Sequence, residues 1–548
     1  MKKREEKILD YIKKYMKVVT HTTTEYERNN KKFFEPWFIK MKKESKNPID
    51  YGFFPVHKDA LKREIPWLLM RGKSKKTIVF IHHTDTVDVD DYGKLKDIAY
   101  DPEKLEEIYK SGEVEIDPRT KADLDAGGWL FGRGGCDMKQ GGAMHMALFE
   151  EYSLDEDFPG SILLMGVPDE ENSSAGMRSA AYLLEDLYNK YDLDYGLMIN
   201  SEPHERLEKD TLVVYDGAIG KIMPICLARG KLAHVGQVYS GFNPINIMAE
   251  IVRRTELNPI FSEVSGNTTS PAATWLYFKD RKEVYDVSLP IYCGGYMSIL
   301  PLKRGPKELM NMLREISVNA FDKVIADMEE SYAEFKKTSK VLYGEMNYKA
   351  NVKFYNEVYD EILKSGNPNF LHAMKELEDE LIEKIEDNKI SRAEAAYRMM
   401  EKLLEFYDDR RPLVMWGIAP PYYPSTNNMD LLSSKQMNEL IGRLQKFSKE
   451  KLNSDLEVQN YYTGICDLSY GMFTESDEVI DYIKNNMILW GDSYEIPLEL
   501  IKKHSMNVLN LGAWGKDFHQ YTERVLIEDL CDKVPKLIDF TVHDFLGH

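Results

Sequence analysis

Several acidic residues and histidines stand directly after predicted strands. His83 and Asp85 follow the apolar run 77–81, and residues two apart in an extended chain point to the same side. A histidine that binds a metal ion commonly donates its second ring nitrogen to a carboxylate, so this pair fits a metal ligand and the group that orients it. Asp137 lies in the glycine-rich segment Gly132–Gly142, where glycines let the backbone approach other groups closely.

Three further segments repeat this placement. They are 168–176, which contains Asp169, Glu170 and Glu171; 200–203, which contains Glu202; and 511–523, which contains His519. Three consecutive acids repel one another unless cations lie nearby or water screens them. Each motif alone is common on protein surfaces. Their joint occurrence, each beside a predicted strand, is a much stronger indication of a functional site.

The elements that would position these residues alternate along the first part of the chain. Apolar runs at 77–81, 161–167 and 195–199 predict buried strands, and amphipathic patterns at 142–152 and 176–190 predict helices. This alternation favours an open α/β sheet with helices on both faces, in which function gathers in loops at the strand ends.

The middle of the chain predicts inserted modules. Residues 212–336 read as a small α+β unit, and residues 337–410 are charged and periodic, as in solvated helices. The α/β pattern returns with the apolar run 412–417. We therefore expect an α/β domain in two parts, 1–211 and 411–548, with an α+β domain and a helical insertion between them.

Composition limits the compartment and the partners. The chain has 548 residues and a formal net charge of −19, which disfavours nucleic acid as a partner. No apolar run approaches the roughly 18 residues that span a bilayer, and the N-terminus lacks a signal-peptide pattern. Five scattered cysteines without a CxxC pair fit a reducing compartment. These features predict an acidic cytoplasmic protein with neither nucleic acid nor membrane as a partner.

The ordered set of motifs resembles the M20 family of metallopeptidases and deacylases. The matching segments are His83-Thr-Asp85 (HxD), Gly132–Lys139 (GRGxxDMK), Asp169–Glu171 (DEE), Glu202-Pro203 and the late His519. The lid domain of that family carries a histidine, here His234. The segments Ala419–Pro424 and Gly515–Val525 resemble its RocB-like, arginine-utilisation branch. The resemblance implies a mixed sheet, and a lid and dimerisation domain at 212–336.

The resemblance also implies two divalent metal ions and a role for each motif residue. His83 and Glu202 would bind one ion, Glu171 and His519 the other, and Asp137 both. Asp85 would orient His83, Glu170 would be the general base, and His234 would hold the substrate carbonyl. Carboxylate and imidazole ligands suit zinc, with cobalt or manganese as alternatives. Relatives also lead us to expect a cis peptide bond between Asp137 and Met138.

The implied reaction is hydrolysis of the amide C–N bond of a small peptide or N-acyl amino acid, with arginine utilisation as one setting. A catalytically silent homologue that binds a ligand or regulates is the alternative, and retention of Glu170 argues against it. A metal-free structural protein would leave the acids at 169–171 unexplained. The lid arginine of family peptidases is missing at 298–300, and Arg304 lies four residues later.

The family resemblance also implies how the chains assemble, through the lid domain. In dimeric relatives the lid histidine reaches the partner's site, so we expect a homodimer in which His234 acts across subunits. The insertion 337–410 could instead cover the cleft or the lid edge, or be a solvated peripheral hairpin.

Overall fold

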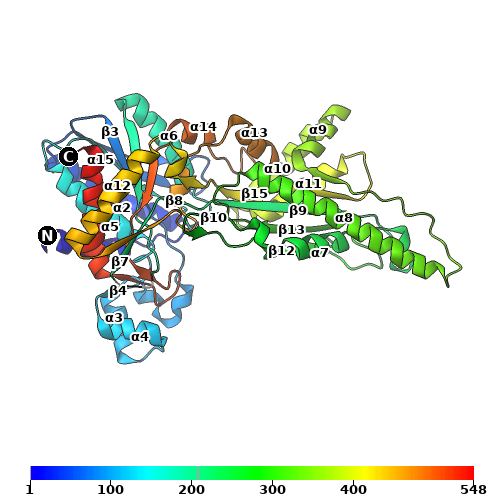
Figure 1. The fold of residues 1–548 in the computed structure, drawn as a ribbon, viewed down its shortest axis with the longest axis horizontal. Helices are drawn as coiled ribbons and strands as arrows, with labels where there is room; N and C mark the ends of the chain where they lie inside the picture. Colours follow the sequence, from blue (N-terminus) through cyan, green and yellow to red (C-terminus); the bar gives the residue numbers. More distant parts are fainter. Residues whose placement is uncertain (1, 207, 209, 548) are drawn as a thin grey trace.

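The computed structural model describes residues 2–206, 208 and 210–547, and it is elongated, with a sheet in each half (Figure 1). The larger sheet has eight strands, in the spatial order β1 (Ile49–Pro55), β2 (Glu64–Arg71), β5 (Ser161–Val167), β3 (Lys76–His83), β6 (Asp194–Asn200), β18 (Asn507–Asn510), β7 (Thr211–Tyr215) and β17 (Asp455–Gln459). The central strands β5, β3, β6 and β18 run parallel, whereas β1 and β2 are antiparallel. The predicted mixed open sheet is confirmed.

Both faces of this sheet are buried, which explains its continuous apolar runs. In β3, Ile78 and Phe80 pack into one core, whereas Val79 and Ile81 pack into the other. The first core includes α1 (Lys2–Met16), α2 (Asn30–Glu44), α5 (Lys139–Ser153), α12 (Ser434–Phe447) and α15 (Val534–Leu546); the second includes α6 (Ala175–Tyr191) and α14 (Leu498–Lys503). Among the described residues, no helix is both long enough and apolar enough to cross a membrane.

A small lobe was not predicted from the sequence. Most of it lies between β3 and α5 along the chain, and its two other strands come from the C-terminal part. It contains α3 (Pro102–Ser111), α4 (Pro118–Ala126) and a three-stranded sheet of β19 (Gly515–Lys516), β20 (Arg524–Leu526) and β4 (Trp129–Phe131). Figure 1 shows α3 and α4 projecting from the larger half of the molecule. The sheet joins this lobe to the C-terminal part of the chain, because β20 pairs with β4.

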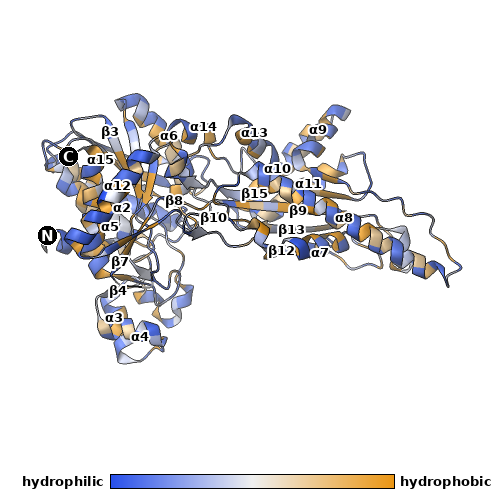
Figure 2. Cartoon of the chain, in the orientation of Figure 1, coloured by the Kyte–Doolittle hydropathy of each residue, from blue (hydrophilic) through white to orange (hydrophobic). Residues whose placement is uncertain are grey.

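The lid half is built on a five-stranded sheet. Its order is β12 (Thr274–Asp280), β13 (Tyr292–Ser298), β9 (Lys221–Arg229), β15 (Leu413–Tyr423) and β14 (Val352–Phe354). α7 (Pro244–Thr255) and α8 (Pro306–Lys336) cover one face, and Figure 2 shows hydrophilic and hydrophobic residues alternating along α8. The sequence assigned 412–417 to the large α/β domain. That assignment is wrong, because β15 pairs with β9 along most of its length. An apolar strand run carries no signal for which of two sheets it joins.

The insertion packs against the opposite face of the lid sheet. Its helices are α9 (Tyr355–Ser365), α10 (Phe370–Glu386) and α11 (Arg392–Glu405). Met400 and Leu403 of α11 share a core with Ile225 and Leu227 of β9, and all four side chains are fully buried. The solvated peripheral hairpin is therefore excluded. The remaining elements include α13 (Asp477–Asn486) and the short strands β8 (Gly217–Ala218), β10 (Val264–Ser265), β11 (Thr268–Thr269) and β16 (Thr426–Asn427).

Candidate metal centre

Three neighbouring parallel strands deliver acidic and imidazole side chains to one edge of the large sheet. His83 is the last residue of β3, Glu170 and Glu171 follow β5, and Glu202 follows β6. Asp137 joins them from the turn before α5. The carboxyl ends of parallel strands meet at the same edge, so these groups converge although up to 119 residues of sequence separate them (83 to 202).

The side chains form two groups that share Asp137. His83 Nε2 lies 2.9 Å from Asp137 Oδ1 and 3.9 Å from Glu202 Oε1. His519 Nε2 lies 3.2 Å from Asp137 Oδ2 and 3.1 Å from Glu171 Oε2. In each group the three potential ligand atoms lie within 4.8 Å of one another. The structure thus brings together all five residues that the sequence proposed as ligands.

The charges of the cluster act strongly on its two histidines. Burial disfavours charge on His83, but Glu202 and Asp137 outweigh it and raise the pKa of the imidazole well above its usual range. Hydrogen bonds to Asp137 and Glu171 raise the pKa of His519 to about 10. Glu171 Oε1 and Glu202 Oε1 are buried without a hydrogen-bond partner. Buried carboxylate oxygens without donors, facing imidazole nitrogens, are a donor set that fits divalent cations.

Asp85 contacts His83 through its backbone and not, as predicted, through its carboxylate. The Nδ1 of His83 lies 2.9 Å from the backbone carbonyl oxygen of Asp85 and 3.7 Å from its carboxylate. The carboxylate instead accepts the backbone N–H groups of Glu170 at 3.1 Å and Glu171 at 3.2 Å. Burial raises the pKa of Asp85 to about 6. Asp85 therefore fixes His83 through its main chain and the two glutamates through its side chain.

Glu170 lies beside the cluster. One of its carboxylate oxygens falls within 4.8 Å of ligand atoms of His83 and Glu171. Burial raises the pKa of Glu170 well above its usual range, and the charges of Glu202 and Glu171 act in the same direction. The fully buried Asp467, whose pKa burial raises to about 7, adds further negative charge. Asp467 was assigned no role from the sequence.

Asp169 turns away from the cluster and belongs to a structural network. Arg63 Nη1 donates to Asp169 at 2.6 Å and to Glu27 at 2.8 Å, and all three side chains are buried. Arg63 is the nearby cation that three consecutive acids require. It precedes the motif by more than 100 residues, in a segment without any pattern that would have identified it.

Glu523 holds the turn that carries Asp137. One oxygen accepts the backbone N–H groups of Cys136 at 3.1 Å and Asp137 at 3.2 Å, and the other accepts from Arg133 at 2.6 Å. The peptide bond between Asp137 and Met138 is cis, as predicted. Glu523 was quoted with the C-terminal motif but was not recognised as a support, because it lies 386 residues from Asp137.

The small lobe fixes the loop of His519. Asp517, two residues earlier, binds Arg524 within the loop and Arg119 and Thr120 of α4. The backbone of His519 has a φ of 61°, a left-handed conformation that costs a non-glycine residue energy and requires such support. The lobe that the sequence did not predict therefore positions one of the predicted ligands.

His234 is not part of this cluster. The start of β9 lies beside the loop of Glu170 and Glu171: Lys221 pairs with Tyr423 of β15, whose hydroxyl accepts a hydrogen bond from Ser174 at 3.2 Å. β9 runs nine residues from there to Arg229, about 25 Å at the rise of a strand. His234 follows at that far end, exposed, and its Nδ1 accepts the backbone N–H of Gly236 at 3.1 Å.

Arg304 is committed elsewhere in the lid. Its guanidinium donates to the carbonyl oxygen of Ile260 at 2.5 Å and lies 3.5 Å from Glu308. It does not take the place of the missing lid arginine.

Comparisons with known proteins agree with this geometry. Residues 111–428 match the model of peptidase family M20/M25/M40, which is more than half of the chain. The chain belongs to this family. RocB and the uncharacterised protein YqjN, both of Bacillus subtilis strain 168, are each 28% identical to it over 91% of this chain and 88–89% of their own length. The predicted resemblance to the RocB-like branch is thus confirmed.

A solved structure shows the same fold. The YXEP protein of Bacillus subtilis, a dinuclear metal-binding peptidase of the M20 family, is 10% identical, with a TM-score of 0.51 over 99% of this chain and 98% of its own. As a member of the M20/M25/M40 family, the chain is a hydrolase.

Proposed function

We propose that the protein is a dinuclear metal-dependent hydrolase that cleaves the amide bond of a small peptide or N-acyl amino acid. The observation that carries the proposal is the pair of three-residue groups sharing the two oxygens of Asp137, with Glu170 beside them. A two-metal site needs a bridging carboxylate of this kind and a base that is not itself a ligand.

Five of these residues would bind metal ions, and Glu170 would transfer protons. His83, Asp137 and Glu202 would hold one divalent ion, and Asp137, Glu171 and His519 the other. Bound ions there supply polarisation of the scissile carbonyl and lower the pKa of water. Glu170 takes the proton of the attacking water and passes it to the leaving nitrogen, for which a buried carboxylate of raised pKa is suited.

The donor set supports zinc, with cobalt or manganese as alternatives, because all ligands are imidazole nitrogens and carboxylate oxygens. Because the motif resemblance leads us to expect arginine utilisation, arginine derivatives are the first substrates to test. A cytoplasmic location stays a prediction.

A metal-loading assay tests the proposal. The protein is stripped with a chelator, loaded separately with zinc, cobalt and manganese, and analysed for metal content. It is then assayed for free amine release from N-acyl amino acids and dipeptides, including arginine derivatives. We expect two ions per chain and activity that chelation removes and metal restores. Failure to retain any divalent ion would refute the centre, whereas two bound ions without hydrolysis of any substrate would favour the silent, ligand-binding alternative.

We also propose a homodimer in which His234 serves the partner's centre. His234 lies too far along the lid to reach its own cluster in this conformation, and Leu232, Val235 and Val238 around it are exposed. The edge strand β12 likewise exposes Leu276 and Phe278. Exposed apolar side chains and an unpaired strand edge are typical of an interface. Light scattering tests this: we expect twice the chain mass, and a monomer that is fully active at all concentrations would refute it.

A further inference from the structure

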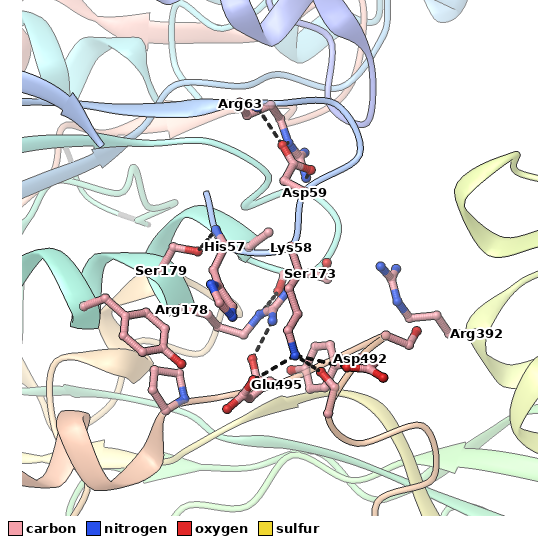
Figure 3. Close-up of a pocket in the computed structure, with 16 residues that line it drawn as sticks. His57, Lys58, Asp59, Arg63, Ser173, Arg178, Ser179, Arg392, Asp492 and Glu495 are labelled. Atoms are coloured by element: carbon pink, nitrogen blue, oxygen red, sulfur yellow. Dashed lines mark hydrogen bonds and ion pairs between the residues drawn. The ribbon is translucent and has the colours of Figure 1, made fainter. Parts of the chain in front are cut away.

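A polar pocket lies between α6 of the large domain and the start of α11 of the insertion, and none of the five candidate metal ligands lines it (Figure 3). It has a volume of about 60 Å³ and shares Arg392 with an adjoining pocket of about 120 Å³. By this measure one water needs only roughly 10–15 Å³, so the space admits a small polyatomic ion. No step of the proposed reaction uses it.

Arg392, at the start of α11, is the unusual residue of this pocket. Its Nε is buried without a hydrogen-bond partner, and among the described residues its side chain makes no hydrogen bond, ion pair or ring contact. Figure 3 shows no dashed line reaching it. A guanidinium cannot lose its proton, so each buried N–H without an acceptor remains a cost. Arg281, which binds Glu394 and Glu401 of the same helix, shows how this chain satisfies a comparable arginine.

A second arginine lines the same pocket. Arg178 of α6 stacks on the ring of Tyr494 at 4.3 Å and donates to the carbonyl oxygens of Ser173 at 3.1 Å and Glu495 at 2.6 Å. Among the described residues, no carboxylate lies within ion-pair distance of Arg178. Burial and then the charge of Arg178 lower the pKa of Arg392, and both guanidinium groups belong to residues that line this pocket.

Four of the acids that line the two pockets are engaged with Lys58 or Arg63, and the fifth, Glu386, lies exposed at the end of α10 in the adjoining pocket. Asp59 pairs with Arg63 at 2.9 Å, as does Asp169 at 2.6 Å. Lys58 lies 3.4 Å from Asp492 and 3.6 Å from Glu495. In the part of the chain that the structure describes, Arg178 and Arg392 are therefore the two lining arginines that have no carboxylate within ion-pair distance.

We propose that this pocket binds a small oxyanion, a carboxylate or phosphate group, held between Arg178 and Arg392. Planar guanidinium groups bind such groups through paired, charge-assisted hydrogen bonds, and the anion would supply the acceptors that Arg392 lacks. The bound anion would join α11 to α6, and α6 begins directly after the loop of Asp169, Glu170 and Glu171. It would thus hold the insertion against the helix that follows the loop of the metal centre.

The test measures binding to the metal-loaded protein. Inorganic phosphate, succinate and chloride are titrated at constant ionic strength, and thermal stability and isothermal calorimetry are recorded. We expect a saturable rise of Tm with phosphate, succinate or both. A response to phosphate alone identifies a phosphate site and one to succinate alone a carboxylate site. No saturable response to either anion overturns the proposal.

Variants separate this site from anion binding at the metals. Arg392→Gln should weaken binding about tenfold or more, since it removes the charge and the paired donors. Arg398→Gln, on the exposed side of the same helix, is the matched control and should bind like the wild type. If Arg392→Gln does not fold, Arg392→Lys keeps the charge without the fork and should still weaken binding several-fold. Equal affinity of wild type and the folded Arg392 variant would overturn the proposal.

Discussion

The cluster around Asp137 and the loop around His234 are both polar groups at strand ends, but their surroundings are opposite. Asp137 is buried and shared between two histidines, and its turn is held by Glu523. His234 is exposed, and its Nδ1 accepts the backbone N–H of Gly236 in its own loop. The cluster is preorganised within one chain, whereas the proposed homodimer would give the loop of His234 a second surface to act on.

The largest effect should come from the base. Glu170→Gln should lower kcat by about 10²–10⁴-fold, the usual contribution of a general base, while both metal ions remain bound. Glu171→Gln is the matched change one residue away and should lose the ion shared with His519. Metal analysis and kcat of the two variants give the answer. Loss of metal from the first variant and not from the second would show that the two roles are reversed.

The second largest effect should come from His234. His234→Ala should be nearly inactive although its own metal cluster is intact. Mixing it with Glu170→Gln under conditions of subunit exchange should restore about a quarter of wild-type activity, because half of the dimers are mixed and each holds one complete site. A mixture that stays inactive after exchange has been demonstrated by mass spectrometry would exclude action across subunits.

Sequence reading succeeded where local order determines position. His83, Glu171 and Glu202 follow apolar runs that form adjacent parallel strands, so the pattern of strand and acid predicted a common edge. The predicted helices 142–152 and 176–190 fall within α5 (Lys139–Ser153) and α6 (Ala175–Tyr191). These features depend on short segments whose apolar period fixes the element.

It failed where distant segments meet. Arg63 and Glu523 support the cluster from places far along the chain. Arg119 and Thr120 hold the loop of His519 through Asp517. No spacing links these residues to the motif residues that they support. The same reason explains β15: its apolar run predicted a strand, but its partner β9 lies nearly 200 residues earlier. The insertion seemed solvated because its charges are numerous, whereas one apolar stripe per helix is enough to build a core with the lid sheet.

A smaller effect tests the support of the cluster. Glu523→Gln replaces one acceptor of the turn and weakens the pair with Arg133, which keeps its bond to Asp91 at 2.7 Å. Groups that orient ligands typically change metal affinity about 10–100-fold, so we expect a loss in that range with kcat little changed at saturating metal. Competition with a chromophoric chelator measures it. Unchanged metal affinity in a folded variant would mean that the turn of Asp137 keeps its conformation without the charge of Glu523.

The smallest expected effect on function comes from the insertion, where the change is in the free energy of unfolding. Leu403→Ala empties part of the core that α11 forms with β9, and a buried leucine of this kind costs about 2–5 kcal/mol when truncated. Leu371→Ala removes the same atoms from a side chain that is 56% exposed on α10 and serves as the control. Urea unfolding should separate the two, with the control within about 0.5 kcal/mol of the wild type. If both variants unfold like the wild type, the insertion does not stabilise the lid, and α11 cannot then transmit an effect of the Arg392 pocket to the rest of the molecule.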